Sequence, residues 1–300
     1  MSVTSRGVAA KPWSVWLLAA RPATLTAAVA PVLVGGAAGI HDGQFRPMPF
    51  VAALGAALLI QIGTNLANDV FDFERGADTA DRLGPPRVTQ HGLASPEQVR
   101  RATALAYGAA AAIGLYLVVV GGWPILIIGM LSIAAGVAYT AGPWPLGYHG
   151  LGDLFVFLFF GLAAVVGTYY LQTGEVTALA FASAASVGLT VTAILVVNNL
   201  RDIESDREAG KKTLAVRLGQ RLTRIQYALL FLGAYALVPL AQVAGGGAWV
   251  WLSWLTLPLA LTLVWAVLRG TAGAALNSVL KRTARLHLAF GSLLALGLLL

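Results

Sequence analysis

The 300-residue sequence contains no cysteine and little charge, since Asp, Glu, Lys and Arg together make up 11% of its residues. The absence of cysteine excludes disulfides, thiolate metal ligands and a cysteine nucleophile. A soluble globular domain carries about 25% charged residues, so this chain has too few to cover a water-facing surface. With 58% hydrophobic residues and a mean hydropathy of +0.76, the composition indicates an integral membrane protein.

Long apolar runs fill most of the sequence. A helix that crosses a bilayer needs about 20 mainly apolar residues. The sequence predicts nine such spans, at residues 13–40, 48–72, 97–121, 123–141, 151–172, 177–200, 222–243, 248–268 and 284–300. We therefore expect one all-α domain over residues 1–300, a polytopic membrane helical bundle with long connections only at 73–96 and 201–221. A capping box, formed by Ser95 and Gln98, is predicted to begin the third span.

The positions of the cations predict how the bundle is oriented. When the nine spans are laid out, nineteen of the twenty Lys and Arg residues fall on the N-terminal side, and only Arg46 falls on the other. By the positive-inside rule, the N-terminus and both long loops lie in the cytoplasm, and the C-terminus lies outside a plasma (inner) membrane. This rule also accounts for the net charge of +7. We accordingly predict no nucleic-acid partner, and no obligate protein partner is evident.

An N-x-x-x-D pattern occurs twice, as Asn65/Asp69 and as Asn198/Asp202, 133 residues apart. Four spans fit in that interval, so the second and sixth spans are predicted to occupy matching places in two parallel four-helix repeats. The repeat halves cover roughly 13–141 and 151–268, and 284–300 is an extra C-terminal helix. An even number of crossings puts both acidic ends on the same side.

Each N-x-x-x-D pattern belongs to a polar stripe on one helix face: Asn65, Asp69 and Asp72 in the first, and Asn198, Asp202 and Asp206 in the second. Clustered carboxylates in a membrane protein are costly unless a cation neutralises them. Oxygen ligands without Cys or His suit Mg²⁺, which commonly keeps a substrate phosphate among its ligands. We predict a Mg²⁺ site formed by Asn65, Asp69, Asp72, Asp78, Asn198, Asp202 and Asp206. For Glu204 and Glu208, which lie off the stripes, ordinary solvated loop charges are the preferred interpretation.

Four cations follow the stripes in the two long loops: Arg82, Arg87, Lys211 and Lys212. Metal-binding carboxylates beside basic side chains can together bind a diphosphate. The sequence has no G-x-x-x-x-G-K-[ST] motif, so this is not a P-loop. Because the site opens into an apolar bundle, the predicted ligand is a diphosphate with a lipid tail.

At these residues the sequence resembles the UbiA superfamily of intramembrane aromatic prenyltransferases. The family's two aspartate-rich motifs match Asn68–Asp72 and Asp202–Asp206, and Arg87 with Gly92 and Ser95 resembles its R-x-x-x-x-G-x-x-S loop. The resemblance spans residues 13 to about 290 and is strongest to the branch that prenylates 1,4-dihydroxy-2-naphthoate. One departure from the N-D-x-x-D-x-x-x-D pattern is visible, because Gly76 occupies the third aspartate position and Asp78 lies two residues later.

The resemblance implies Mg²⁺-dependent transfer of a polyprenyl group from a polyprenyl diphosphate to 1,4-dihydroxy-2-naphthoate. Carbon dioxide and diphosphate are lost, giving demethylmenaquinone in menaquinone biosynthesis. It implies catalytic roles for Asp69, Asp72, Asp202 and Asp206. It implies diphosphate binding by Arg82, Arg87, Lys211 and Lys212, and a substrate pocket with Arg21, Asn68, Tyr139 and Asp153.

Simpler roles compete for three of the pocket residues. Arg21 can snorkel to the interface, Tyr139 can belong to the interfacial aromatic belt, and Asp153 can cap a helix. Two alternative functions also stay open. One is a sister prenyltransferase with another acceptor, such as 4-hydroxybenzoate or homogentisate, or with a phytyl donor. The other is a secondary transporter, which also uses repeats and intramembrane carboxylates, although here the acids lie at one membrane face.

Overall fold

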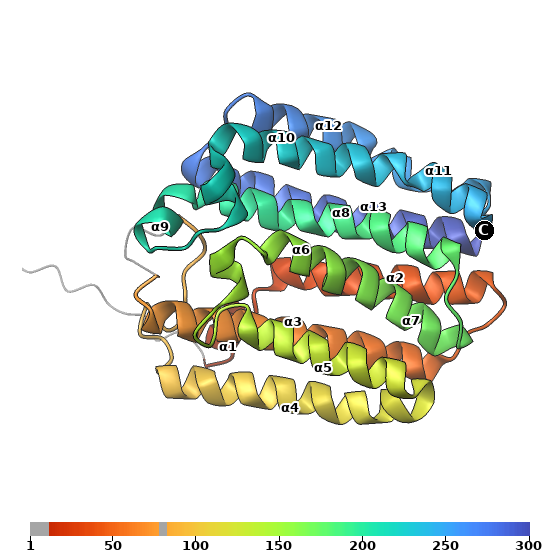
Figure 1. Cartoon of the computed structure of the whole chain (residues 1–300), viewed down its shortest axis with the longest axis horizontal. Coiled ribbons are helices and arrows are strands. Elements are labelled where there is room, and N and C mark those ends of the chain that lie inside the picture. The colour runs from red at the N-terminus through yellow and green to blue at the C-terminus, as the bar shows by residue number, and fades with distance from the viewer. Residues whose placement is uncertain (1–11, 78–82) are drawn as a thin grey trace, which may run out of the picture.

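The structure is a computed structural model that describes residues 12–77 and 83–300. Within these residues every regular element is a helix, and the long helices run side by side along the long axis of the molecule (Figure 1). The all-α class predicted from the sequence is therefore confirmed.

The elements follow one another in a simple order. The first part of the chain forms α1 (Pro12–Ala20), α2 (Pro22–His41), α3 (Pro47–Glu74), α4 (Pro96–Gly121) and α5 (Trp123–Ala138). A 3₁₀ turn (Leu146–His149) leads into a continuous rod made of α6 (Gly152–Val156), a π-helical stretch (Phe157–Ala163) and α7 (Ala164–Thr173). Then come α8 (Ala178–Arg201), the short α9 (Ile203–Glu208), and α10 (Leu214–Ala236), which continues through α11 (Val238–Ala241) and a π-helical turn (Gln242–Gly246). The chain closes with a 3₁₀ segment (Ala248–Thr256), α12 (Leu257–Leu268), a 3₁₀ turn (Gly273–Ala275) and α13 (Leu276–Leu299).

Seven helical stretches in the described part of the chain are long and apolar enough to cross a membrane. They are 22–41, 47–74, 96–121, 152–173, 178–201, 214–246 and 248–268. The chain is therefore a multi-pass membrane protein. α5 is a shorter apolar helix of 16 residues, and α13 carries Lys281, Arg282 and Arg285 in its first half. The full count of nine spans, the two-repeat architecture and the orientation of the termini stay predictions.

The predicted first span, 13–40, is wrong as one continuous helix, because the chain breaks at Arg21. Pro22 occupies the first position of α2, and a proline disfavours helical backbone in the residue before it. Arg21 accordingly adopts φ 53° and ψ 70°, a left-handed conformation that a non-glycine residue seldom takes. α1 stays a separate short helix whose Trp13, Trp16 and Leu17 are exposed.

The connection predicted at 201–221 is also mostly helical. α9 occupies its middle, and α10 begins at Leu214, eight residues before the predicted span at 222. Gly219 interrupts α10 with φ 73° and ψ 173°, which is why its first turn reads as loop in the sequence. The capping box before α4 is confirmed, since the Gln98 amide donates to Ser95 Oγ at 3.2 Å and the Ser95 amide donates to Gln98 Oε1 at 2.8 Å.

α8 forms the centre of the bundle. Buried residues make up 72% of its apolar window, whereas in α4 the share is only 17%, as expected for a helix that faces lipid. The largest buried cluster joins α8 to residues of α2, α10 and α13. The π-helical stretch packs directly on α8, and a Cβ added to Gly161 would lie 2.6 Å from the Cα of Gly188. Only glycine permits this approach.

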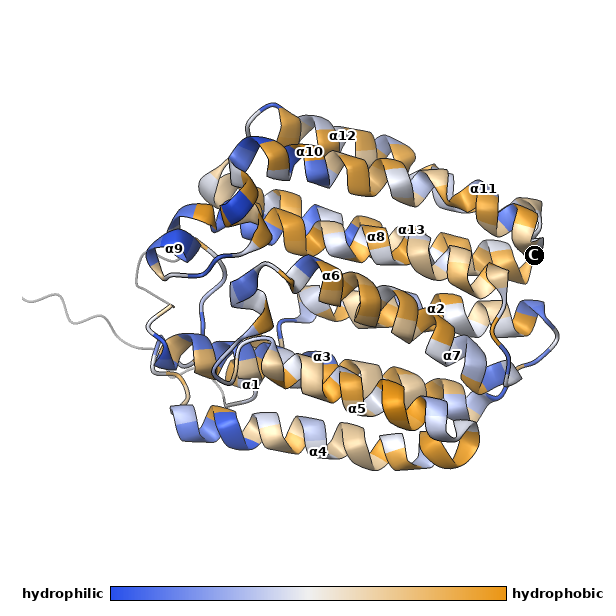
Figure 2. Cartoon of the chain, in the orientation of Figure 1, coloured by the Kyte–Doolittle hydropathy of each residue, from blue (hydrophilic) through white to orange (hydrophobic). Residues whose placement is uncertain are grey.

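Both acidic stripes end at the same end of the molecule. Hydrophilic residues gather there, around α9 and at the starts of α4 and α10, while the middle of the bundle is hydrophobic (Figure 2). The C-terminal ends of α3 and α8 both lie at this polar end (Figure 1). The placement of the two motifs on one side, predicted from the even number of crossings, is confirmed.

We expect Gly161→Val to destabilise the protein by about 1–3 kcal/mol, because an added side chain would push α8 and the π-helical stretch apart. Thermal denaturation in detergent, followed by circular dichroism, measures this effect. Gly108→Ala is the matched control, since an added Cβ there meets nothing within 4 Å. Equal melting temperatures for Gly161→Val and the wild type would show that this close packing is dispensable.

Candidate active site

A cavity of about 550 Å³ extends inward from the polar end of the bundle. One face of α3 lines it from Ala53 and Ala56 through Gln61 and Asn65 to Asp72. The full set of α3 positions that line the cavity follows the spacing of one helix face, at 53, 56, 57, 60, 61, 64, 65, 68 and 72. Ala53 and Asp72 are 19 residues, or roughly 28 Å, apart along the helix. The cavity is therefore long, apolar toward one end of α3 and polar at the other. Such a shape suits a ligand with a charged head and an apolar tail.

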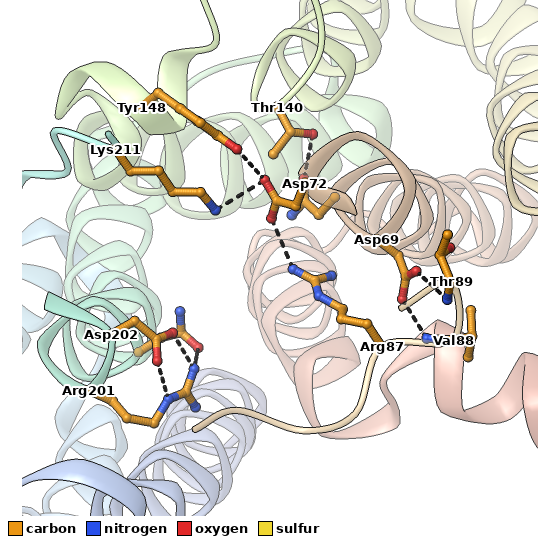
Figure 3. Close-up of polar contacts among 12 residues, drawn as sticks. Asp69, Asp72, Arg87, Val88, Thr89, Thr140, Tyr148, Arg201, Asp202 and Lys211 are labelled. Atoms are coloured by element: carbon orange, nitrogen blue, oxygen red, sulfur yellow. Dashed lines mark hydrogen bonds and ion pairs between the residues drawn. The ribbon is translucent and has the colours of Figure 1, made fainter. Parts of the chain in front are cut away.

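The Asp72 carboxylate is bonded to three other side chains at the polar end. Its Oδ2 lies 3.1 Å from Nη2 of Arg87, and its Oδ1 lies 3.1 Å from Nζ of Lys211 and accepts a 2.8 Å hydrogen bond from the Tyr148 hydroxyl (Figure 3). All four residues line the cavity, and the Asp72 side chain is 5% exposed. Lys211 reaches Asp72 from the loop after α9. One carboxylate thus joins the two motif-bearing segments of the chain.

Tyr148 ties these segments together a second time. Lys211 Nζ lies 4.8 Å from the centre of its ring, close enough for a cation–π contact. The Lys212 amide donates a 2.9 Å hydrogen bond to the Tyr148 carbonyl. The 3₁₀ turn Leu146–His149 therefore connects the end of α3 to the loop before α10, and it holds the Lys211 ammonium over the cavity.

In the second stripe, the charge of the Asp202 carboxylate is balanced by the preceding residue, Arg201. Arg201 forms a bidentate pair with the Asp202 carboxylate, and its Nη2 also donates to Asn198 Oδ1 at 2.9 Å (Figure 3). Its Nη1 donates to Asn277 Oδ1 at 2.8 Å, and Asn277 in turn donates to the carbonyl of Leu83 at 2.7 Å. Asn198, Asp202 and Asp206 all line the cavity. The structure thus brings Asp202 and Asp206 to the same cavity as Asp72.

Asp69 is placed differently from the other motif acids. It is 2% exposed and does not line the cavity. Its Oδ2 accepts from the Val88 amide and its Oδ1 from the Thr89 amide, both at 3.0 Å. The carboxylate points to the loop after Arg87 and away from the Asp72 cluster (Figure 3).

Three further predicted residues lie at the break between α1 and α2 or on α3. Arg21, Asn65 and Asn68 all line the cavity. The Asn65 amide group donates to the Ala20 carbonyl and to Thr24 Oγ1, both at 2.9 Å, so it fixes the backbone on either side of Arg21. Asn68 Oδ1 accepts a 3.0 Å hydrogen bond from Thr140.

Tyr139 lines the cavity as predicted, but Asp153 and Lys212 do not. Asp153 accepts a 2.6 Å hydrogen bond from Gln226, which ties α6 to α10, and makes no capping bond at the start of α6. The Lys212 side chain is exposed and contributes through its backbone amide. Asp78 and Arg82 lie outside the described residues.

Tyr148, Arg201 and Asn277 are functional candidates that the sequence reading did not single out. In the sequence, Arg201 is one of the nineteen cations that predict the orientation of the bundle. Its position directly before Asp202, at the end of a predicted span, is the signal that could have identified it as a site residue. Tyr148 and Asn277 carry no such signal. They reach the site through tertiary contacts with elements far away in the sequence.

Among residues 12–77 and 83–300, no three His, Asp or Glu side chains stand close enough together to hold a metal ion in this arrangement. The chemistry of the donors nevertheless suits a hard cation. Asp72, Asp202, Asp206 and Asn198 offer only oxygen ligands and line one cavity. Arg87, Lys211 and Arg201 are the internal cations that now balance Asp72 and Asp202.

Comparison with known proteins assigns the chain to a family. Residues 28–291 match the sequence profile of the UbiA prenyltransferase family. The chain belongs to the UbiA prenyltransferase family. It is therefore an enzyme of prenyl transfer, which sets the transporter alternative aside.

This UbiA chain has several curated relatives that share one name. It is 39% identical over 292 residues to the 1,4-dihydroxy-2-naphthoate octaprenyltransferase of Escherichia coli (strain K12), covering 95% of both chains. It is 40% identical over 272 residues to the protein of the same name from Mycobacterium tuberculosis, covering 89% of this chain and 91% of that one.

Solved structures agree on the fold. A UbiA homologue from Aeropyrum pernix K1 superposes with a TM-score of 0.70 at 17% identity, over 90% of this chain and 96% of that one. A UbiA homologue from Archaeoglobus fulgidus, determined bound to GPP and Mg²⁺, gives a TM-score of 0.66 at 14% identity, over 93% and 99%.

We expect Tyr148→Phe to lower kcat/KM roughly 10- to 150-fold, because a hydrogen bond to a charged group contributes about 1.5–3 kcal/mol. Steady-state kinetics of prenyl transfer in nanodiscs measures the change. Tyr116→Phe is the control, since Tyr116 lies on α4 and is 40% exposed. Identical kinetics for the two variants would exclude the Tyr148 hydroxyl from the function of this UbiA site.

Proposed function

We propose that this chain transfers a polyprenyl group from a polyprenyl diphosphate to 1,4-dihydroxy-2-naphthoate. One observation carries the proposal: a single cavity joins a cluster of carboxylates and cations to an apolar channel along α3. The name shared by the Escherichia coli and Mycobacterium tuberculosis relatives, which are 39% and 40% identical to this chain, supports naphthoate as the acceptor.

Mg²⁺ is the cofactor that the donor set suits, and a homologue of the same fold was determined with GPP and Mg²⁺. Asp72, Asp202, Asp206 and Asn198 are the residues that would hold it. The chemistry that Mg²⁺ supplies when bound is neutralisation of the diphosphate, which makes it a better leaving group. Asp72 and Asp202, which are paired with Arg87, Lys211 and Arg201, would offer their carboxylate oxygens to the metal.

The chain's own cations complete the diphosphate site. Arg87 and Lys211 line the cavity beside Asp72, where each can donate hydrogen bonds to phosphate oxygens. Their charge stabilises the leaving group as the bond between the prenyl C1 and the diphosphate oxygen breaks. Arg21, held in place by Asn65, approaches the same end from the break before α2.

The new bond forms between the prenyl C1 and the ring carbon of the acceptor that carries the carboxylate. That carboxylate leaves as carbon dioxide, its bonding electrons return to the ring, and the product is the quinol form of demethylmenaquinone. The allylic carbocation character at C1 makes water a competing nucleophile. The apolar lining of the cavity keeps water away from it.

The predicted topology places this reaction at the cytoplasmic face. The polar end holds both motifs and most of the hydrophilic residues (Figure 2), and the positive-inside rule assigns such an end to the cytoplasm of a plasma (inner) membrane. A soluble aromatic acid can reach the cavity from that side, while the prenyl tail stays among the helices.

A product assay tests the proposal. Protein in nanodiscs is given a polyprenyl diphosphate with 1,4-dihydroxy-2-naphthoate, 4-hydroxybenzoate or homogentisate, and products are identified by mass spectrometry. We expect prenylated, decarboxylated product from the naphthoate alone, abolished by EDTA and restored by Mg²⁺. Equal conversion of another acceptor would refute the acceptor assignment, and activity that persists in EDTA would refute the metal.

The channel along α3 makes a separate prediction. Ala56 lines the cavity well away from the diphosphate end, so Ala56→Phe should obstruct a long tail and leave a short one room. We expect kcat/KM for a long polyprenyl diphosphate to fall at least about 10-fold, because a blocked tail shifts the reacting end out of position. For geranyl diphosphate, kcat/KM should change little. Val51→Phe, on the exposed face of the same helix, is the control. Equal losses with both donors would show that the tail lies elsewhere.

A further inference from the structure

Asp69 is the first aspartate of the N-D-x-x-D motif, yet its surroundings differ from those of the second. With 3.6 residues per turn, it is rotated about 100° from Asn68 and about 60° from Asp72 around the axis of α3. Asn68 and Asp72 line the cavity, and Asp69 does not. Its position in the motif therefore does not bring its carboxylate to the place where a metal would sit.

Both oxygens of this carboxylate are already used. Each accepts one backbone N–H at 3.0 Å, from Val88 and from Thr89, in a setting where Asp69 is 2% exposed. Hydrogen bonds from N–H groups to an ionised acceptor are among the stronger ones in proteins. Because two adjacent amides bond to two oxygens of one rigid group, the contact fixes both the position and the direction of the loop.

The residue immediately before this contact is Arg87. It is 3% exposed, and its Nη2 lies 3.1 Å from Asp72 Oδ2. Val88 is fully buried in a small cluster with Leu66, Val70 and Val99, so the loop also packs on α3 and α4. Asp69 thus holds the backbone one residue away from an arginine that faces the cavity.

We infer that Asp69 is a positioning residue: it holds the loop at Val88 and Thr89 so that the Arg87 guanidinium faces the diphosphate, and it is not a ligand of the metal. The inference rests on the proposed function, because it assigns Arg87 to the diphosphate of the donor. It separates the two aspartates of the motif by role, with Asp72 facing the cavity and Asp69 bonded to the loop at Val88 and Thr89.

The first experiment examines the loop without any metal or substrate. Asp69→Asn keeps the size of the side chain but replaces one acceptor oxygen by an NH₂ group, which cannot accept from a backbone amide. In the full-length, EDTA-treated protein, we expect faster hydrogen–deuterium exchange in peptides that cover residues 84–94. Asp42→Asn is the matched control. It changes a carboxylate that accepts from Tyr169 in the distant connection after α2, and exchange in 84–94 should stay as in the wild type.

The second experiment measures kinetics as a function of Mg²⁺ and donor. For Asp69→Asn, we expect kcat/KM for the prenyl diphosphate to fall about 10- to 100-fold, as is typical when a binding group is displaced by about 1 Å. The Mg²⁺ concentration that gives half-maximal activity should not change. In an Arg87→Lys background the further loss caused by Asp69→Asn should be much smaller, because the positioned guanidinium is already gone.

Asp69→Glu provides a second variant, which also serves if Asp69→Asn does not accumulate. It retains a carboxylate that can bind Mg²⁺ but moves it by one methylene, so a positioning role predicts faster loop exchange and weaker donor binding here as well. A raised Mg²⁺ requirement, unchanged exchange in 84–94, or full additivity with Arg87→Lys would each overturn the inference. A wild-type protein that forms no product in the same assay would instead refute the proposed function.

Discussion

The buried Asp72 carboxylate is the interaction on which the site depends, because it is the point where separate parts of the chain meet. Arg87 comes to it from the loop before α4, Tyr148 from the turn before α6, and Lys211 from the loop before α10. Removal of one partner from a buried ion pair costs about 3–5 kcal/mol, and a hydrogen bond to a charged group contributes about 1.5–3 kcal/mol, so each of these segments is held to the end of α3. The polar end of the cavity is built around this carboxylate, and the apolar channel extends from it along the same helix.

The helical class and the two acidic helix ends could be predicted from the sequence, since both follow from periodic patterns within single segments. The break at Arg21 was visible in Arg21-Pro22, but the resulting left-handed backbone was not, because it depends on how Asn65 and Thr24 bond to the turn. The start of α10 was missed for a related reason. Its first turn is polar and is separated from the apolar part by Gly219, so hydropathy alone assigned it to a loop.

The spacing of polar residues along α3 could not predict which of their side chains face the cavity. Residues spaced by four lie within about 40° of one another around a helix. Their spacing therefore cannot show which of them faces a cavity and which faces a neighbouring loop. Asp69 and Asn65 share a stripe in the sequence, yet Asn65 lines the cavity and Asp69 faces the amides of Val88 and Thr89. Tyr148 and Asn277 could not be predicted at all, since their contacts join residues 76 and 194 positions apart.

We expect the separate helix α1 to lie at the membrane interface. Its exposed Trp13 and Trp16 are residues that settle at the level of the lipid headgroups, and the break that follows it turns the chain inward at Arg21, on the wall of the cavity. With α1 in that place, we expect the entrance to the cavity to lie just beneath the headgroups. A water-soluble ring and a water-insoluble chain can meet at that level without either one leaving the phase that dissolves it.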